Sequence, residues 1–139
     1  MNQYAQVAIN TVIASRNSKK MVNILWDLEA RNVITSETAR RKGCPKGAFL
    51  GLCENGNVTG INSGTYTSSK KNKQYAIDAL NILKNHKNNP NRPMNPNTTN
   101  NCVFSIDPIV LWNMLPNRPG THNSQMYIVC ELWNNGLIN

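Results

Sequence analysis

The sequence lacks any long hydrophobic run, and its N-terminal stretch has no positively charged segment ahead of its apolar residues. A membrane-spanning helix needs roughly 18 consecutive apolar residues, and a secretory signal begins with positive charge. These two absences exclude a transmembrane segment and a secretory signal of the usual kind. We therefore expect a cytoplasmic protein that has no membrane among its partners.

Closely spaced cysteine pairs are also missing. The four cysteines, Cys44, Cys53, Cys102 and Cys130, show none of the short C-x-x-C spacings of zinc and redox sites. Because a cytoplasmic chain of 139 residues can bury a core without crosslinks, we expect all four thiols to be reduced. A metal site built from Cys44, Cys53, His86 and His122 would have irregular spacing, so we predict neither a metal nor another cofactor.

Several motifs of enzymes and nucleic-acid-binding proteins are absent as well. The chain has no P-loop, no dinucleotide-binding glycine pattern, no paired carboxylates and no Ser-His-Asp arrangement. Aromatic residues make up only 6% of the chain, and Tyr66 and Tyr75 are the ones near its basic region. This scarcity argues against a platform on which single-stranded bases would stack.

Positive charge, in contrast, is abundant and localised. The formal net charge is +8, and residues 40–92 carry ten cations against Glu54 and Asp78, which accounts for the whole excess. The rest of the chain has five charges of each sign. A basic region of this kind is typical of a surface that binds anions, although solvated lysines alone can also produce it.

Apolar residues recur at helical spacing along most of the chain, and no alternating pattern long enough for a sheet is present. The fold class we predict is all-α, a compact orthogonal bundle of about five to six helices in one domain, with an Asn/Pro-rich loop at 85–101. Helices are expected at 3–15, 19–33, 45–55, 68–84 and 122–134, with a short turn after Thr35 or Ser36 and a short helix opened by Asp107-Pro108.

The boundaries of two helices follow from capping chemistry. Pro45 suits the first position of a helix, with Cys44 as its N-cap, and Gly56 provides a left-handed stop that lets Val58 fold back on the helix end. The last helix is expected to be capped by Thr121 or Asn123 and to stop at Gly136. The predicted core contains Phe49, Leu52, Leu80, Leu83, Val129 and Leu132.

Cations gather where they oppose the helix dipole, at the starts of the helices near Pro45 and Ser69. An anion resting on the free N–H groups of both starts would remove this conflict, and glycines would permit its close approach. The predicted ligand-binding residues at these starts are Arg40, Arg41, Lys42, Lys46, Gly47, Lys70, Lys71 and Lys73. We expect Lys46 and Lys71 to be exposed.

A third helix start, the segment "THNSQM", offers neutral hydrogen-bonding groups. His122, Asn123 and Gln125 could contact a base edge, a ribose or an amide, or could act only as a cap. If the protein is an enzyme, Cys44 is the candidate nucleophile and His122 its base, because a thiol near cations at a helix start favours the thiolate. Without paired carboxylates or a Ser-His-Asp arrangement, the sequence favours a protein that is not an enzyme.

Three blocks of the chain resemble a family of small bacterial and phage proteins classed as a domain of unknown function. They are "GCPKGAFLGLCENGNVTGI", "SKKNKQYAIDALNIL" and "HNSQMYIVCELWNNGLI", which cover about half of the chain. The resemblance implies a single small domain and an origin in a bacterial cell, possibly encoded by a phage. It implies no catalytic residue.

The function we predict is non-enzymatic binding of a phosphate-bearing ligand, either a nucleotide or the backbone of DNA or RNA, at the two basic helix starts. The first alternative is an inhibitor or adaptor that presents the same basic face to an acidic protein surface. The second is a small hydrolase or transferase that uses Cys44 and His122.

Overall fold

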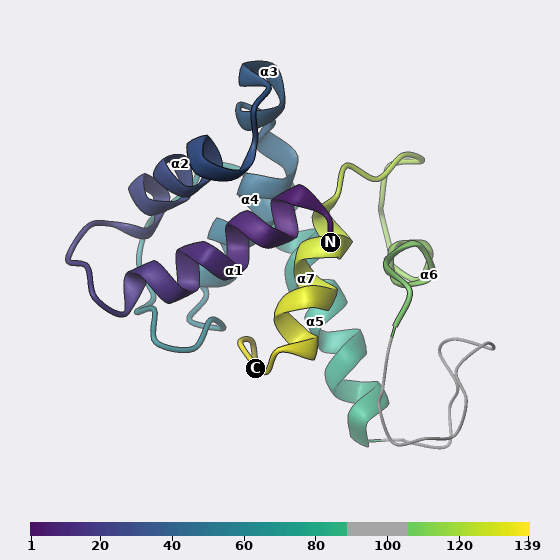
Figure 1. Ribbon diagram of the computed structural model, residues 1–139. Coiled ribbons are helices and arrows are strands. Elements are labelled where there is room, and N and C mark those ends of the chain that lie inside the picture. The colour runs from purple at the N-terminus through teal and green to yellow at the C-terminus, as the bar shows by residue number, and fades with distance from the viewer. Residues whose placement is uncertain (89–105) are drawn as a thin grey trace.

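The computed structural model describes residues 1–88 and 106–139, and these residues form seven helices arranged as one bundle (Figure 1). They are α1 (Gln3–Ser15), α2 (Val22–Val33), α3 (Glu37–Arg40), α4 (Gly43–Glu54), α5 (Lys70–Asn88), α6 (Pro108–Asn113) and α7 (Gln125–Asn134). The described residues contain no strand, only an isolated antiparallel bridge between Val58 and Ile138. The predicted all-α class is confirmed.

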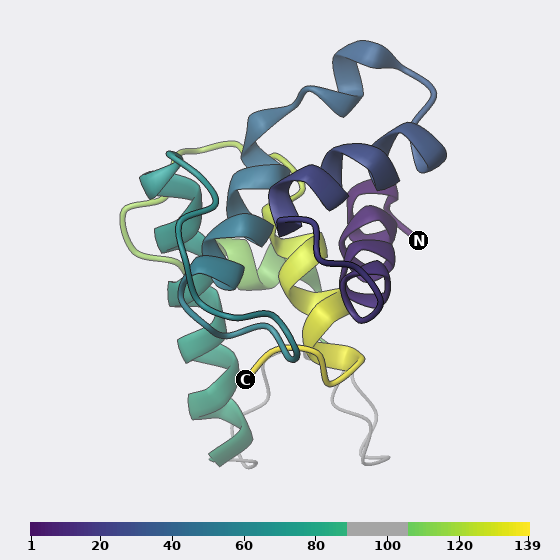
Figure 2. The same cartoon turned by 90° about the vertical axis from the view of Figure 1, so that its left-hand side faces the viewer.

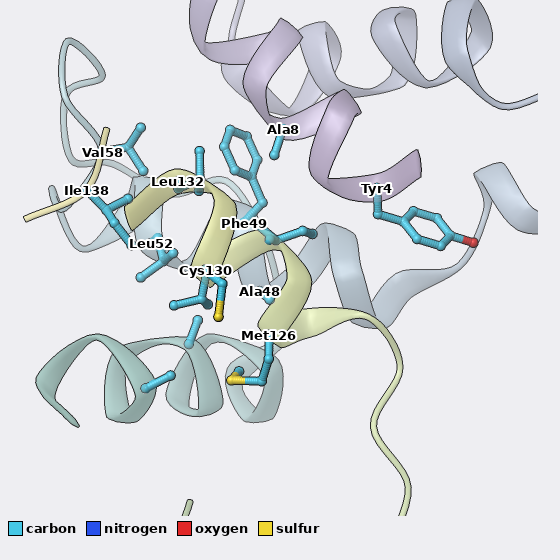
Figure 3. Close-up of a cluster of buried hydrophobic side chains, with 14 of the residues drawn as sticks. Tyr4, Ala8, Ala48, Phe49, Leu52, Val58, Met126, Cys130, Leu132 and Ile138 are labelled. Atoms are coloured by element: carbon cyan, nitrogen blue, oxygen red, sulfur yellow. The ribbon is translucent and has the colours of Figure 1, made fainter. Parts of the chain in front are cut away.

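The core lies where α4 and α7 meet, enclosed by α1 and α5 (Figure 3). Phe49 from α4 stacks on Trp26 from α2 with ring centroids 5.2 Å apart, which joins the α1–α2 pair to the central helix. The six residues predicted for the core, Phe49, Leu52, Leu80, Leu83, Val129 and Leu132, are all fully buried. Burial of these side chains is the main stabilising term for a bundle of this size.

Two glycines let α4 and α5 pack unusually close together. Gly47 and Gly51 are four residues apart on one face of α4, and α4 and α5 form the most extensive helix contact of the described residues. A Cβ atom on Gly47 would lie 2.7 Å from the Ser69 side chain, and one on Gly51 would lie 2.5 Å from the Lys73 Cα. The absence of both Cβ atoms therefore sets the distance between the helices.

The helices α4 and α7 end in the same way, and their tails pair. Gly56 and Gly136 have φ angles of +77° and +68°, and each follows a C-cap asparagine. In each tail, hydrogen bonds from the two residues after the cap reach carbonyls in the last turn, as in a Schellman motif. Val58 folds back into the core as predicted, and its tail bonds to the C-terminal tail.

Two predicted helix starts are wrong. The helix α4 begins at Gly43 with Lys42 as N-cap, so Cys44 is not the cap and Pro45 is the third residue. Proline fits any position in the first turn, because the N–H groups there have no partner within the helix. The helix α7 begins at Gln125 after Ser124, a left-handed N-cap, rather than after Thr121 or Asn123.

Three further boundaries differ from the predictions. The helix α2 begins at Val22 instead of residue 19, and α5 begins at Lys70 instead of residue 68 and continues to Asn88. Residues 85–88 are therefore helical, whereas we predicted a loop for all of 85–101. No proline interrupts the helix before Pro90, and Lys87 in its last turn lies 5.8 Å from the centre of the Trp133 ring. The remainder of the predicted loop, 89–101, lies outside the described residues.

The close contact of α4 and α5 generates the first prediction. Gly51→Ala should lower the free energy of unfolding by about 1 to 3 kcal/mol, because its methyl group meets the α5 backbone and the helices must separate. Gly43→Ala is the matched control on the same helix, since a Cβ there meets nothing within 4 Å. Urea denaturation of both variants checks this, and equal stabilities would contradict it.

Candidate functional site

The ribbons of α4 and α5 run side by side (Figure 2). An open hollow of about 470 Å³ lies beside the starts of these two helices. We call it the α4–α5 hollow. Four segments line it: Asn23 of α2, the first half of α4, the connector that leads into α5, and Asn72 in the first turn of α5. Its lining residues are Asn23, Gly43, Cys44, Lys46, Gly47, Leu50, Tyr66, Thr67, Ser68, Ser69 and Asn72.

The start of α4 presents free backbone donors to this hollow. The N-cap, Lys42, makes no side-chain hydrogen bond to the helix, so the N–H groups of Gly43 and Cys44 are uncapped. Pro45 has no N–H to add. Gly43 leaves the α4 backbone open, since a Cβ there would meet nothing within 4 Å, whereas Ser69 packs against Gly47 one turn further along. A small anion could therefore approach the α4 backbone closely.

Hydroxyl and amide side chains form the opposite wall, and a chain of hydrogen bonds orders them. Asn72 donates to the Ser69 hydroxyl oxygen at 2.8 Å and accepts from the Gln125 Nε2 at 3.1 Å. Gln125 is 1% exposed, and its Oε1 accepts from the N–H of Asn123. The start of α7 therefore holds Asn72 and Ser69 in place, and Ser69 turns its oxygen toward Gly47.

Glu54 anchors the connector from the other side. Its Oε1 accepts from the backbone N–H groups of Tyr66 and Thr67 at 2.7 and 2.8 Å, and its Oε2 accepts from the Lys73 ammonium at 2.9 Å. Burial alone would raise the pKa of Glu54, but these hydrogen bonds and the charge of Lys73 outweigh it and hold the pKa below its ordinary value. The carboxylate thus fixes the hollow's wall.

Four of the predicted anion-binding cations already have partners within the protein. Lys46 pairs with Asp27 at 2.8 Å, Lys73 pairs with Glu54, and Arg41 pairs with Glu37 across one helical turn at 2.7 Å. Arg40 donates to the carbonyl of Ile34. Lys46 is the one that lines the hollow, and it is half-buried, so our expectation that it is fully exposed is wrong.

The other three cations, Lys42, Lys70 and Lys71, are exposed and take part in no ion pair among the described residues. Lys42 precedes α4, and the other two begin α5. They flank the two helix starts that the hollow joins. The uncompensated positive charge near the hollow therefore comes from these three side chains together with the helix dipoles.

The segment at the start of α7 is separate from the lining of the hollow. His122 packs at 6.4 Å from the Trp112 ring and 6.0 Å from the Tyr127 ring. Gln125 is buried behind Asn72 and reaches the hollow only through it. Among the described residues no hydrogen bond links His122 to Cys44, so the structure does not bring the candidate base to the candidate nucleophile.

The described cysteines are free thiols in contrasting environments. Cys53 and Cys130 are buried, and burial raises the pKa of both, to about 12 for Cys130. Cys44 is partly exposed in the hollow. Cys102 lies outside the described residues.

Sequence reasoning missed several of the lining residues. The run Thr67, Ser68 and Ser69 directly precedes the lysines that begin α5, and a cluster of hydroxyls before a helix start is a usable signal for hydrogen-bond donors. Asn23 gives no such signal, because only the packing of α2 against α4 brings it to the hollow.

The described residues include no helix able to cross a membrane.

The anchoring role of Glu54 generates a prediction about pH. Because the folded protein lowers the pKa of Glu54, the stabilisation is complete well above the ordinary pKa of 4.5 and is lost as pH falls below it. Glu54→Gln should lower the free energy of unfolding at pH 7 by about 2 kcal/mol and flatten its decline in acid. The control, Glu37→Gln, removes an exposed pair and should change stability by about 0.5 kcal/mol or less.

Unfolding curves at a series of pH values test this expectation. If Glu54→Gln and Glu37→Gln follow the wild-type pH dependence equally, Glu54 does not anchor the connector.

A third prediction concerns thiol reactivity. Alkylation of the native protein should modify Cys44 well before Cys53 and Cys130, because only the thiolate reacts and burial suppresses it in the latter two. Mass spectrometry of peptides from timed samples measures the order. In denatured protein, all four cysteines should be alkylated without a reductant. A mass increase of two hydrogen atoms on reduction would instead reveal a disulfide.

Comparison with known proteins identifies the chain only at the level of a family. No curated protein matches it, and no solved structure matches it. One family model matches residues 1–139, the whole chain. The resemblance carried by the three sequence blocks is confirmed to that extent, and the protein belongs to a family of unknown function, DUF6979.

Proposed function

We propose that the α4–α5 hollow binds a small phosphate-bearing ligand, with a nucleotide as the best candidate and the backbone of DNA or RNA as the alternative. The observation that carries this proposal is the meeting of an uncapped helix start, an uncovered glycine at that start (Gly43) and a wall of hydroxyls around one open space. The volume of about 470 Å³ suits a ligand of nucleotide size.

Each part of the hollow has a role in this proposal. The N–H groups of Gly43 and Cys44 would donate to phosphate oxygens, aided by the α4 dipole. The hydroxyls of Ser68 and Ser69 would add donors from the opposite wall. Lys46 would attract an anion only weakly, because Asp27 neutralises most of its charge. Lys70 and Lys71, which begin α5, would therefore supply most of the electrostatic attraction for the phosphate.

The proposal is for binding without catalysis, in bacterial or phage-infected cells. The Cys/His alternative loses support, because the base it requires, His122, packs against Trp112 and Tyr127 instead of lining the hollow. An acidic protein surface remains a partner to test against, since the exposed lysines would attract it equally.

Calorimetric titration with nucleoside mono-, di- and triphosphates, inorganic phosphate, and short single- and double-stranded DNA tests the proposal. Lys70→Gln/Lys71→Gln should weaken nucleotide binding about tenfold, which is about 1.4 kcal/mol, without lowering the melting temperature, because both side chains are exposed. The matched control, Lys84→Gln/Lys87→Gln, removes the same charge about 20 Å further along α5.

A second readout does not depend on charge. A ligand in the hollow should slow alkylation of Cys44 in the wild-type protein, because Cys44 lines the hollow. Failure of every phosphate-bearing compound to bind, or equal weakening by the two double variants, would overturn the proposal. Binding of DNA that falls steeply with salt and leaves Cys44 unprotected would place the ligand on the surface instead.

A further inference from the structure

The helix α2 is apolar on two opposite faces. Its inner face buries Val22, Leu25, Trp26 and Ala30 in the core. Its outer face carries Ile24 and Leu28, which are 46% and 37% exposed, and the N-cap residue Met21 adds a third exposed side chain at 51%. A surface helix normally has polar residues opposite its core face, so this apolar outer face is unexplained by the fold itself.

Positive charge frames this face at both ends. At one end, the turn before α2 carries Arg16, Lys19 and Lys20, and this turn projects from the bundle on the left of Figure 1. At the other end, Arg31 follows Leu28 by about one helical turn on the same face. All four are exposed, and none takes part in an ion pair within residues 1–88 and 106–139. The nearby carboxylate, Asp27, is already engaged by Lys46.

We propose that the outer face of α2, formed by Met21, Ile24 and Leu28 between these cations, docks an acidic amphipathic helix of a partner protein. The apolar residues follow the i, i+3, i+7 spacing that packs against a second helix. Carboxylates on the partner's flanks would pair with Lys19 and Lys20 at one end and Arg31 at the other. This surface is different from the α4–α5 hollow, and its partner is defined by charge as well as shape.

Two other occupants fit the charges less well. An anionic bilayer presents negative charge over its whole plane, so it would repel the Asp27 side chain, which is 57% exposed, as well as attract the flanking cations. A second copy of the chain would bring another +8 charge and another set of unpaired cations against the first. An acidic helix can avoid both conflicts, because it can place carboxylates opposite the cations at the two ends of the face and a neutral residue opposite Asp27.

Photo-crosslinking in cells of the source organism tests the proposal. A benzophenone amino acid is placed at Ile24, and at Met114 as the control, because both side chains are 46% exposed. The probe at Ile24 should form an adduct that the probe at Met114 does not form. The partner peptide in this adduct should come from an acidic amphipathic helix. Lys19→Glu/Lys20→Glu/Arg31→Glu should reduce the yield at least fivefold.

Each other result overturns the proposal. Adducts with lipid would indicate a bilayer, and adducts with this chain itself would indicate self-association or an internal contact. A crosslinked peptide without acidic residues, a yield unaffected by the triple charge reversal, or no adduct beyond that at Met114 would each remove the acidic helix as the partner. Circular dichroism of the probe-bearing proteins verifies that they remain folded.

Discussion

The close approach of α4 and α5 is the constraint on which most of the structure depends. Gly47 and Gly51 remove the two side chains that would otherwise separate the helices, so that Ser69 and Lys73 pack on the α4 backbone. This contact brings the two helix starts together and creates the hollow between them. It also brings Lys73 within reach of Glu54, which in turn holds the connector that closes one wall.

Internal pairing changes the meaning of the basic composition. The concentration of cations near two helix starts suggested one large anion-binding cluster, but Asp27, Glu37 and Glu54 each neutralise one member of it. A buried, hydrogen-bonded pair such as Lys73–Glu54 contributes to the fold, whereas the exposed Arg41–Glu37 pair contributes little. The charge left over is smaller and better located, at Lys42, Lys70 and Lys71, on either side of the uncapped α4 start.

The hollow and the outer face of α2 present different chemistry. The hollow offers backbone and hydroxyl donors in a space of ligand size, whereas the α2 face offers three exposed apolar side chains between cations. Both surfaces use α2, since Asn23 lines the hollow and Ile24 points outward. If the hollow binds an anionic ligand and the outer face of α2 binds an acidic partner, a displacement of α2 would alter both binding surfaces.

The sequence by itself determined the elements that depend on local chemistry. Helical periodicity identified the core positions, and Asp107-Pro108 marked the start of α6. The asparagine-glycine pairs at 55–56 and 135–136 marked two helix ends, because glycine adopts the left-handed conformation there without steric cost. The first residue of a helix was less predictable: Pro45 fits several positions of a first turn, and Ser124 adopts a left-handed conformation that its identity does not require. Only the tertiary structure decided that Lys46 and Lys73 are paired, since each lies 19 residues from its carboxylate partner and meets it through the packing of two helices. Helix packing also places His122 against Trp112, outside the lining of the hollow, and brings Asn23 into that lining. No local pattern encodes contacts between residues so distant along the chain.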